Sequence, residues 1–399
     1  MESVYPSKGD VFMSITILEA MKLDSVKNFK LLTEGWGLDR KIEKVGILDY
    51  EMIDKIEGQF GRGDFVISSF LFARNDVKLL IEAIKGLIKD GVSGLGIKDI
   101  YYKELPAEII EYANERSFPI FIFDNSVYFE DIITDIMDSI KDKDNYDLLE
   151  TKVDIIIKDN LSKVMIKELA SEINSSFKEK FIVAYCKEKK YIDDANIIRL
   201  LQSFEKSENK SIYNSVFKYR KGILIIFTYE NLEKNDVVKR LGGLIRNIGI
   251  DTEKYIIGIS NKHLSLKKLA KGIKESFYAV RVGEISDKSE ILYGDIGVYK
   301  IIMPFVNEVW IKEFYEEIIL PLKEYDEKYN TYILSTAIKY IENDGSVKRT
   351  SEELFQHDNT IRYRINKMKE ILNMENSDGN FYEQLSIAIK IYKIFNEGL

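Results

Sequence analysis

The side chains best suited to chemistry in this sequence are the cations and amides of the stretch LFQHDNTIRYRINKMKEIL, residues 354 to 372. Residues 359 to 373 carry four cations against one anion, in a chain whose formal net charge is -8. Guanidinium, ammonium, amide and phenol groups are the donors that bind phosphates and the edges of DNA bases. The residues that we expect to contact DNA are His357, Asn359, Thr360, Arg362, Tyr363, Arg364, Asn366 and Lys367, together with Lys348 and Arg349 upstream.

A helical pattern indicates which of these side chains face outward. At about 100° per residue, four apolar residues fall within about 40° of one another and form one face that must pack on a neighbour. They are Ile361, Ile365, Met368 and Leu372. Tyr363, Asn366 and Lys367 lie on the opposite side, whereas Arg364 lies at the edge of the apolar face. Tyr363, Asn366 and Lys367 are therefore the leading candidates for contact with bases.

The segments before this helix are typical of a helix-turn-helix. SVKRTSEELF predicts a short helix with Val347, Leu354 and Phe355 turned inward, and QHD is a turn into the second helix. Residues 358 to 360 are common N-cap types, so free N–H groups at the start of the second helix would face a phosphate or a base edge. A helix over TYILSTAIKYIEND supplies a third wall, which places the module at about residues 330 to 373. The alternative is an ordinary solvated amphipathic helix.

Composition bounds the class of protein. The 399 residues suffice for two or three domains, and a hydrophobic content of 45% allows each a buried core. A single cysteine, Cys186, excludes an intramolecular disulfide, and two histidines, His263 and His357, are too few for a histidine metal site or a Ser-His-Asp triad. No segment approaches the roughly 20 apolar residues of a membrane span, and the N-terminus lacks a signal-peptide pattern. We expect a cytoplasmic protein that contacts no membrane.

Residues 1 to 125 alternate helical patterns with short apolar runs, which predicts an α/β domain with a mostly parallel sheet. Candidate strands are 42–48, 65–68, 94–97 and 120–123, and candidate helices are 16–23, DVKLLIEAIKGLIKDG and the segment that Pro106 opens. Residues 126 to 180 predict two amphipathic helices separated by the polar break KDKDNYD. They are either a connector between domains or the seam of a dimer.

Residues 181 to 300 predict the order βαββαβ with a hairpin turn at YRKGI, which indicates a split βαβ, ferredoxin-like α+β domain. After Pro304 the pattern is helical, so residues 301 to 399 form an all-α region. The expected fold class is a multidomain α/β plus α protein. The last helix is either the lid of the helix-turn-helix core or a dimer contact, with one face formed by Phe381, Leu385, Ala388, Tyr392 and Phe395.

Six residues around the turn match the pattern L-x-x-H-x-N-T-x-x-Y-R at fixed spacing: Leu354, His357, Asn359, Thr360, Tyr363 and Arg364. Through them the chain resembles the PucR family of bacterial transcriptional regulators, whose C-terminal helix-turn-helix has this pattern. Ser351 stands where that family commonly has alanine, and Asp358 where it has an arginine that would contact a phosphate. GLDRKIEKVGILD, GRGDFVISS and LPAEIIEYANERSFPIFIFD resemble the family's N-terminal PucR domain, which the resemblance implies is sensory or regulatory.

The Gly-rich turns of this N-terminal domain, at residues 61–63 and 91–96, fit neither a P-loop nor a Rossmann fingerprint. We interpret them as structural turns. If a small-molecule effector binds to this domain, the polar residues expected to hold it are Arg62, Asp64, Ser68 and Ser69.

The middle region resembles the GGDEF-like domain of the same family, a relative of diguanylate cyclases. The order of its elements and the segment YIIGISNKHLSLKKLAKGIKESFYAVRVG carry this likeness. Cyclase chemistry needs carboxylates on a hairpin and on the first strand, because they hold two metal ions. This chain has Arg220 and Lys221 in the hairpin, and Tyr185 and Cys186 on the strand. We therefore expect a degenerate domain with no catalytic residue, no metal site and no cofactor.

Together these features predict a ligand-responsive transcriptional regulator of PucR type, not an enzyme. The resemblance implies control of genes for purine or other nitrogen- or carbon-source catabolism. Its partners would be a double-stranded DNA operator, a small-molecule effector and a second copy in a homodimer or higher homo-oligomer, since one short helix rarely gives nanomolar specificity. Two alternatives stay open: an enzyme that turns over a nucleotide and carries a DNA-binding appendage, and an adaptor whose basic helix binds an acidic partner.

Overall fold

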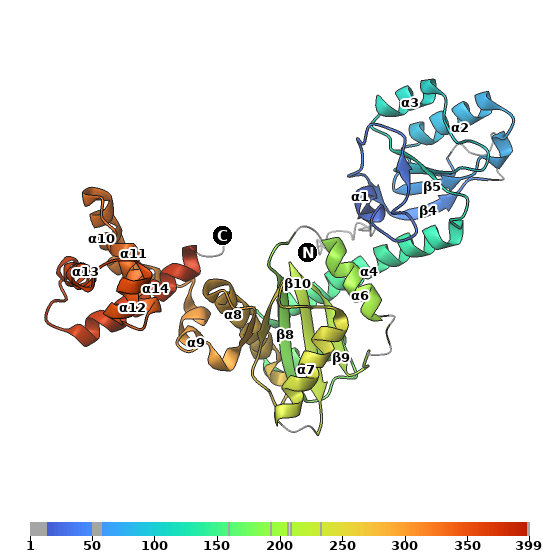
Figure 1. The fold of residues 1–399 in the computed structure, drawn as a ribbon. Helices are drawn as coiled ribbons and strands as arrows, with labels where there is room; N and C mark the ends of the chain where they lie inside the picture. The colour runs from blue at the N-terminus through green and yellow to red at the C-terminus, as the bar shows by residue number, and fades with distance from the viewer. Residues whose placement is uncertain are drawn as a thin grey trace, which may run out of the picture. The chain divides into compact units, whose positions relative to one another are not determined.

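The computed structural model describes residues 14–49, 58–158, 160–191, 194–205, 207, 210–231 and 234–396. The chain divides into two compact units, Met1–Thr151 and Lys152–Leu399, and each is described by itself (Figure 1). Residues 1–13, part of the stretch in which no signal peptide is expected, lie outside the described residues. Within the described ranges, no helix is long and apolar enough to cross a membrane.

The first unit is built on a five-stranded sheet in the order β2-β7-β6-β5-β4. Four of its strands are parallel neighbours: β4 (Lys44–Ile47), β5 (Asp64–Ser68), β6 (Gly94–Lys98) and β7 (Ile120–Phe123). β2 (Lys30–Leu31) is antiparallel to β7, and a separate antiparallel pair is formed by β1 (Ile15–Thr16) and β3 (Lys41–Ile42). The predicted α/β class and mostly parallel sheet are confirmed.

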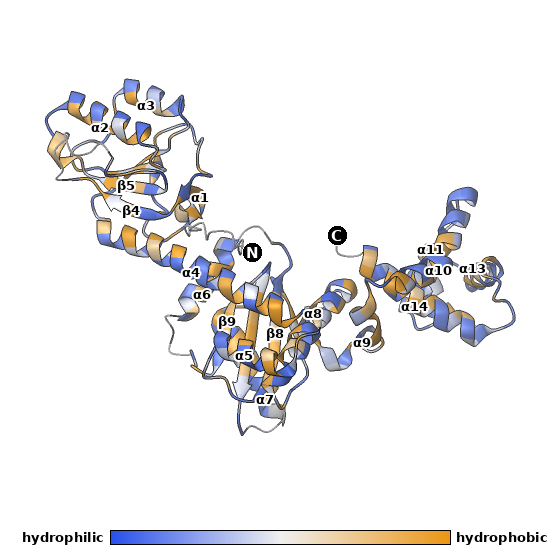
Figure 2. Ribbon diagram, turned by 180° about the vertical axis from the view of Figure 1, so that it is seen from behind, coloured by the Kyte–Doolittle hydropathy of each residue, from blue (hydrophilic) through white to orange (hydrophobic). Residues whose placement is uncertain are grey.

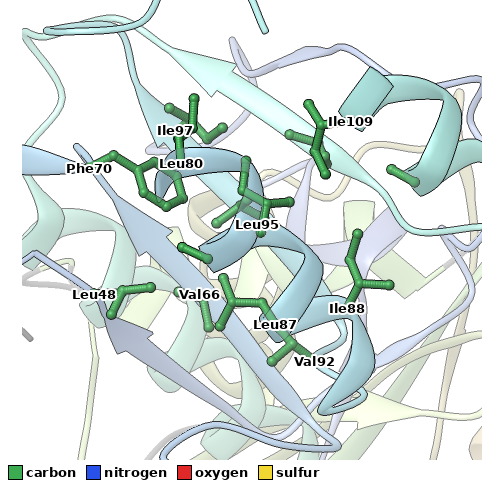
Figure 3. Close-up of a cluster of buried hydrophobic side chains, with 14 of the residues drawn as sticks. Leu48, Val66, Phe70, Leu80, Leu87, Ile88, Val92, Leu95, Ile97 and Ile109 are labelled. Carbon is green, nitrogen blue, oxygen red and sulfur yellow. The ribbon is translucent and has the colours of Figure 1, made fainter. Parts of the chain in front are cut away.

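One apolar cluster joins this sheet to two predicted helices, α2 (Val77–Lys89) and α3 (Ala107–Asn114). Figure 3 shows Leu80 and Leu87 of α2 together with Leu95 of β6 in this cluster. All three side chains are fully buried. A parallel sheet covered in this way needs strands that are apolar on both faces, which explains the short apolar runs of the sequence.

A second cluster joins the sheet to α1 (Ile17–Ala20) and to the start of α4 (Phe129–Ile156). α1 is shorter than the helix expected over residues 16–23. α4 is one continuous helix of 28 residues, so the break expected at KDKDNYD is wrong. That segment contains no glycine or proline, and charged side chains on a solvated face do not interrupt a helix. Figure 2 shows hydrophilic and hydrophobic residues alternating along α4.

The second unit contains α5 (Lys163–Ile173) and a five-stranded sheet in the order β12-β11-β8-β10-β9. The strands are β8 (Lys180–Glu188), β9 (Asn214–Tyr219), β10 (Gly222–Tyr229), β11 (Tyr255–Ile259) and β12 (Glu290–Leu292). β11, β8, β10 and β9 are antiparallel neighbours, which is the order of a split βαβ fold. The connecting helices are α6 (Asp194–Glu205) and α7 (Lys234–Ile248). The predicted order βαββαβ is confirmed, and β12 extends it parallel to β11.

The hairpin between β9 and β10 turns through Arg220 and Lys221, with Tyr219 paired to Gly222. Its left-handed residue is Arg220, with a φ of 49°, and not the glycine. Gly222 is needed for space, because a Cβ there would lie 2.4 Å from the Cys186 carbonyl oxygen. The predicted hairpin is therefore confirmed, and its glycine lets two strands approach closely.

After α8 (Leu269–Ser286) and β12, the described chain is helical, as predicted for the region after Pro304. The helices are α9 (Tyr299–Ile302), α10 (Val309–Tyr329), α11 (Ile333–Glu342), α12 (Val347–Glu353), α13 (Asp358–Ile371) and α14 (Asp378–Asn396). α10, α11, α13 and α14 share one apolar core. Ile391 and Ile394 of α14 belong to a second cluster with α8 and α9.

Candidate nucleic-acid interface

α12 and α13 form a helix-turn-helix whose turn is closed by the backbone. α12 is capped by Leu354, after which Phe355 adopts a left-handed conformation with a φ of 52°. The Gln356 N–H then donates to the Ser351 carbonyl at 2.9 Å, which satisfies a carbonyl otherwise left free at the end of α12. The turn occupies residues 355 to 357, one residue earlier than the predicted QHD.

His357 is the N-cap of α13. Its Nδ1 accepts a hydrogen bond from the Asn359 N–H at 3.1 Å, and its backbone is extended. The prediction that the cap lies among residues 358 to 360 is wrong, because the imidazole takes the place of the usual Asp, Asn or Thr acceptor. With Nδ1 accepting, Nε2 carries the proton and remains able to donate to a phosphate.

Asp358 is tied to the preceding helix. Its carboxylate accepts a hydrogen bond from the hydroxyl of Ser351 in α12, and that hydroxyl also lies 2.8 Å from the Lys348 carbonyl oxygen. Ser351 is buried and Asp358 is partly buried. An acid in the first turn also suits the positive end of a helix. The two positions that depart from the PucR pattern therefore meet in one contact that joins the two helices of the motif.

The apolar face of α13 packs as its spacing predicts. Ile361 and Met368 are fully buried, Ile365 is buried, and Leu372 is partly buried. The surrounding core comes from α10, α11 and α14. α11 supplies the predicted third wall, and α10 adds a further one that the sequence did not indicate. Phe381, Leu385 and Ala388 of α14 lie in the same core and Tyr392 packs against it, as predicted, whereas Phe395 packs in the second cluster with α8 and α9.

The opposite face of α13 carries an exposed group of donors. Asn359, Arg362 and Asn366 are exposed, and Tyr363 exposes 65% of its surface. Thr360 is partly buried, and its N–H already donates to the His357 carbonyl at 2.9 Å. Arg362, Tyr363 and Asn366 are the members of the predicted set that most clearly remain available to a ligand.

Two of the predicted cations are occupied within the module. Arg364 donates from Nη1 to the Thr336 hydroxyl at 2.9 Å and lies over the Tyr332 ring at 5.7 Å. Lys367 pairs with Glu370 at 2.8 Å, and that carboxylate raises the pKa of the Lys367 ammonium. Its Nζ also lies 5.4 Å from the centre of the Tyr325 ring. Arg364 holds α13 to α11, as its place at the edge of the apolar face indicated, and Lys367 is less accessible than predicted.

The two upstream cations differ from one another. Arg349 donates from Nη2 to the Asn343 carbonyl at 2.6 Å and pairs with Asp344 at 3.2 Å, so it braces the loop before α12. Lys348 is exposed. Of this pair, Lys348 is therefore the better candidate for contact with a phosphate.

Phe355 does not turn inward as predicted. It exposes 93% of its surface, because the left-handed backbone that ends α12 directs its side chain away from the core. Leu354 and Val347 do pack against the core. The handedness of a single turn residue decides this outcome, and no apolar pattern in the sequence signals it.

The four candidate effector residues of the first unit do not lie together. Asp64 begins β5 and pairs with Lys44 at 3.3 Å, and Arg62 precedes it. Ser68 ends β5, and Ser69 follows. The Ser69 N–H and hydroxyl both donate to Asp49, at 2.7 and 2.9 Å. The set therefore separates into two pairs at opposite ends of one strand.

The hairpin of the middle region is bound to α4. The Arg220 Nη2 lies 3.2 Å from Asp154, and the Tyr219 hydroxyl donates to the same carboxylate at 2.6 Å. Lys221 lies over the Tyr191 ring at 5.5 Å. Arg220 and Lys221 are exposed, and the pair with Asp154 links the hairpin tip to the end of α4.

Two further side chains that could take part in chemistry, Cys186 and His263, are packed inside the second unit. Cys186 is fully buried, which raises the pKa of its thiol, so it is a core residue. The His263 ring stacks on Phe181, and its Nε2 lies 3.0 Å from a Glu275 carboxylate oxygen. Among the described residues, no three His, Cys, Asp or Glu side chains gather to hold a metal ion.

Two family models match the chain. The Purine catabolism regulatory protein-like family, PucR, matches residues 19–140, and the PucR C-terminal helix-turn-helix domain matches residues 333–391. Both ends of the chain are thus similar to PucR proteins. The second match covers α11, α12, α13 and most of α14, which are the elements that build the exposed donor face.

Two curated relatives come from Bacillus subtilis (strain 168). The proline-responsive transcriptional activator PutR is 26% identical over 203 residues, which are 50% of this chain and 44% of the relative. The purine catabolism regulatory protein is 27% identical over 130 residues, 32% of this chain and 24% of its own. The alignments thus span less than half of either PucR relative.

A solved structure, the regulator of polyketide synthase expression from Bifidobacterium adolescentis, aligns with 62% of this chain and 99% of its own at 12% identity. The TM-score is 0.30, which is too low for this likeness to support an argument about fold.

Proposed function

We propose that this chain is a DNA-binding transcriptional regulator of the PucR type, in which α13 enters the major groove of a double-stranded operator. The division of α13 into two faces carries the proposal. One face is sealed into a core by Ile361, Ile365 and Met368, while the other presents Tyr363 and Asn366 to solvent. A helix that is fixed on one side and carries hydrogen-bond donors on the other is what direct contact with base edges needs.

The side chains divide into two roles. Asn366, Tyr363 and Arg362 are placed to contact base edges, because they are exposed beyond the first turn of α13. The start of the helix, with the His357 Nε2 and the exposed Asn359, suits a phosphate. Arg364 and Lys367 support this surface from within the module and contribute less to base contact.

We further propose that two copies act together and that an effector controls them. A two-fold dimer places two recognition helices on half-sites about 34 Å apart, which raises specificity beyond that of one short helix. The relatives named as proline-responsive and as a regulator of purine catabolism support control of nitrogen- or carbon-source catabolism by a small metabolite. Binding to a bacterial operator would require a cytoplasmic location.

The proposed organisation is a sensory domain over residues 1–125, a connector over 126–180, a degenerate GGDEF-like domain over 181–300 and the helical DNA-binding region over 301–399. The split βαβ strand order supports the middle assignment. The hairpin tip carries Arg220 and Lys221, and Arg220 is held by Asp154, so cations stand where carboxylates for metal ions would be needed. We infer that this domain has a structural or signal-transmitting role and does not turn over nucleotides.

Binding of the full-length chain to duplex DNA tests the proposal. DNA from upstream of its own coding sequence and duplexes selected from a random pool would be titrated at several salt concentrations. We expect binding that weakens as salt rises, and a large loss in a variant with Arg362→Ala and Tyr363→Ala. Tyr128→Ala is the matched control, because Tyr128 lies in the first unit and exposes the same 65% of its surface as Tyr363.

Two outcomes would replace the proposal with its alternatives. Absence of binding to any duplex, together with salt-dependent capture of an acidic protein by α13, would make the chain an adaptor. Turnover of a nucleoside triphosphate with magnesium or manganese would make the middle region an enzyme and overturn its assignment as degenerate.

A further inference from the structure

Phe355 has the most exposed large apolar side chain in the described part of the chain, at 93% of its surface. It stands in the turn between α12 and α13, two residues before the N-cap His357. Two residues span at most about 7 Å, so the ring is attached close to the end of α13 that would approach DNA. The Phe355 ring is therefore not stabilised by burial in the core of the free protein.

The backbone at Phe355 is also unusual for its residue type. Left-handed residues elsewhere in α10 to α14 and their loops are Asn330, Asp344 and Asn373, whose short polar side chains tolerate this conformation, and Gly345. Glycine is the common residue at this place after a helix, because it has no Cβ. Phe355 is the bulky exception, so both its conformation and its exposure are unfavourable in the unbound chain.

We propose that Phe355 is a further DNA-contacting residue, whose ring packs against the C5-methyl group of a thymine at the edge of the half-site. The thymine methyl is the apolar group that the major groove presents, and phenylalanine is among the side chains that contact it. The inference rests on the proposed function and deepens it, since it adds an apolar contact to a surface otherwise composed of hydrogen-bond donors. A DNA base is thus the partner of a ring that is not packed in the core.

The test uses the full-length chain and a duplex selected from a random pool. Each thymine of the site is replaced in turn by deoxyuridine, which removes only the C5-methyl group. We expect one thymine in each half-site whose replacement weakens wild-type binding about fourfold, the effect of losing one apolar carbon from a buried contact. The Phe355→Ala variant should bind the selected duplex and the duplex with deoxyuridine at that thymine equally. The Phe355→Leu variant, which keeps an apolar side chain, should still distinguish them.

Phe355→Gly separates this contact from folding. Glycine relieves the left-handed conformation, so amide hydrogen exchange in α12 and α13 should be no faster than in the wild type, while discrimination of thymine from deoxyuridine disappears. Tyr128→Ala should keep the wild-type discrimination. Wild-type binding that is insensitive to every thymine methyl, or a Phe355→Ala variant that retains the fourfold difference, would overturn the inference and leave the proposed DNA binding intact.

A change in oligomeric state would also overturn it. If Phe355→Ala shifts the chain toward monomer in sedimentation without altering thymine discrimination, the ring contacts a second copy and not DNA. Absence of any duplex binding by the wild type would instead refute the proposed function itself.

Discussion

Because the Asp358 carboxylate binds the Ser351 hydroxyl, we expect a substitution at Asp358 to lower the stability of the motif and to raise its affinity for DNA. Asp358→Arg restores the residue type that the PucR pattern has after its histidine. The substitution removes the acceptor of the Ser351 hydroxyl and places a cation in the first turn of α13. It also offers a guanidinium to the DNA backbone at the point where the helix approaches it.

The size of the stability loss follows from the partners that remain. A hydrogen bond to a charged acceptor contributes about 1.5–3 kcal/mol, but the Ser351 hydroxyl keeps the Lys348 carbonyl as a second acceptor, so we take about 1 kcal/mol. Replacing an acid by a cation at the positive end of a helix removes one favourable term of about 0.5 kcal/mol and adds an unfavourable one of similar size. The sum is about 2 kcal/mol for local opening of the motif.

Hydrogen exchange of the full-length chain measures that opening directly. About 2 kcal/mol corresponds to exchange roughly 30-fold faster in peptides that cover α12 and the start of α13, with peptides of the first unit unchanged. Binding should move the other way, since one added phosphate contact steepens the salt dependence by about 0.9 in log–log slope. Asp358→Asn is the control that keeps an acceptor without the charge, and it should give a smaller acceleration and no change in slope.

Unchanged exchange in Asp358→Arg would show that the Ser351 contact does not stabilise the motif. An unchanged salt slope, with exchange accelerated as expected, would show that this residue does not face the DNA backbone.

Three further outcomes follow from the contacts of the second unit. Arg364→Ala should loosen the junction with Thr336, seen as faster exchange in α11 and α13, while the base preference of the protein stays the same; a changed base preference would contradict this role. Asp154→Asn should free the hairpin tip at Arg220, increasing its cleavage by trypsin, and unaltered cleavage would show that the pair does not protect the turn. Burial raises the pKa of Glu342, but the ammonium groups that this carboxylate binds outweigh burial and hold the pKa below its ordinary value of 4.5. The contribution of Glu342 to stability is therefore present at neutral pH and is lost as the pH falls through the lowered pKa. The urea midpoint of Glu342→Gln should therefore fall less on acidification than that of the wild type, and parallel curves would refute the assignment.

Periodicity predicted those elements in which one rule dominates. The apolar spacing of α13 placed Ile361, Ile365 and Met368 correctly, because a helix that packs on one side must repeat its apolar residues every three or four positions. The sheet of the first unit and the split βαβ order of the second followed from the same reasoning with a period of two or with uniform apolar runs.

Contacts between distant residues and the handedness of turns were not predictable in this way. The cap at His357 and the outward ring of Phe355 depend on φ values at single positions in the turn. The bond from Arg364 to Thr336 joins residues 28 apart, so no local pattern encodes it. The uninterrupted α4 shows the opposite error, since its run of charges suggests a break but contains no residue that ends a helix.

The specificity ratio of the full-length protein tests the central claim most directly. Affinity for a selected duplex and for a scrambled duplex of the same composition would be measured at one salt concentration, for the wild type and for a variant with Tyr363→Ala and Asn366→Ala. We predict that the wild type prefers the selected duplex and that the variant loses between about fivefold and 150-fold of that preference per half-site, while its binding to scrambled DNA changes little. Equal binding of both duplexes by the wild type, or an undiminished ratio in the variant, would contradict the account.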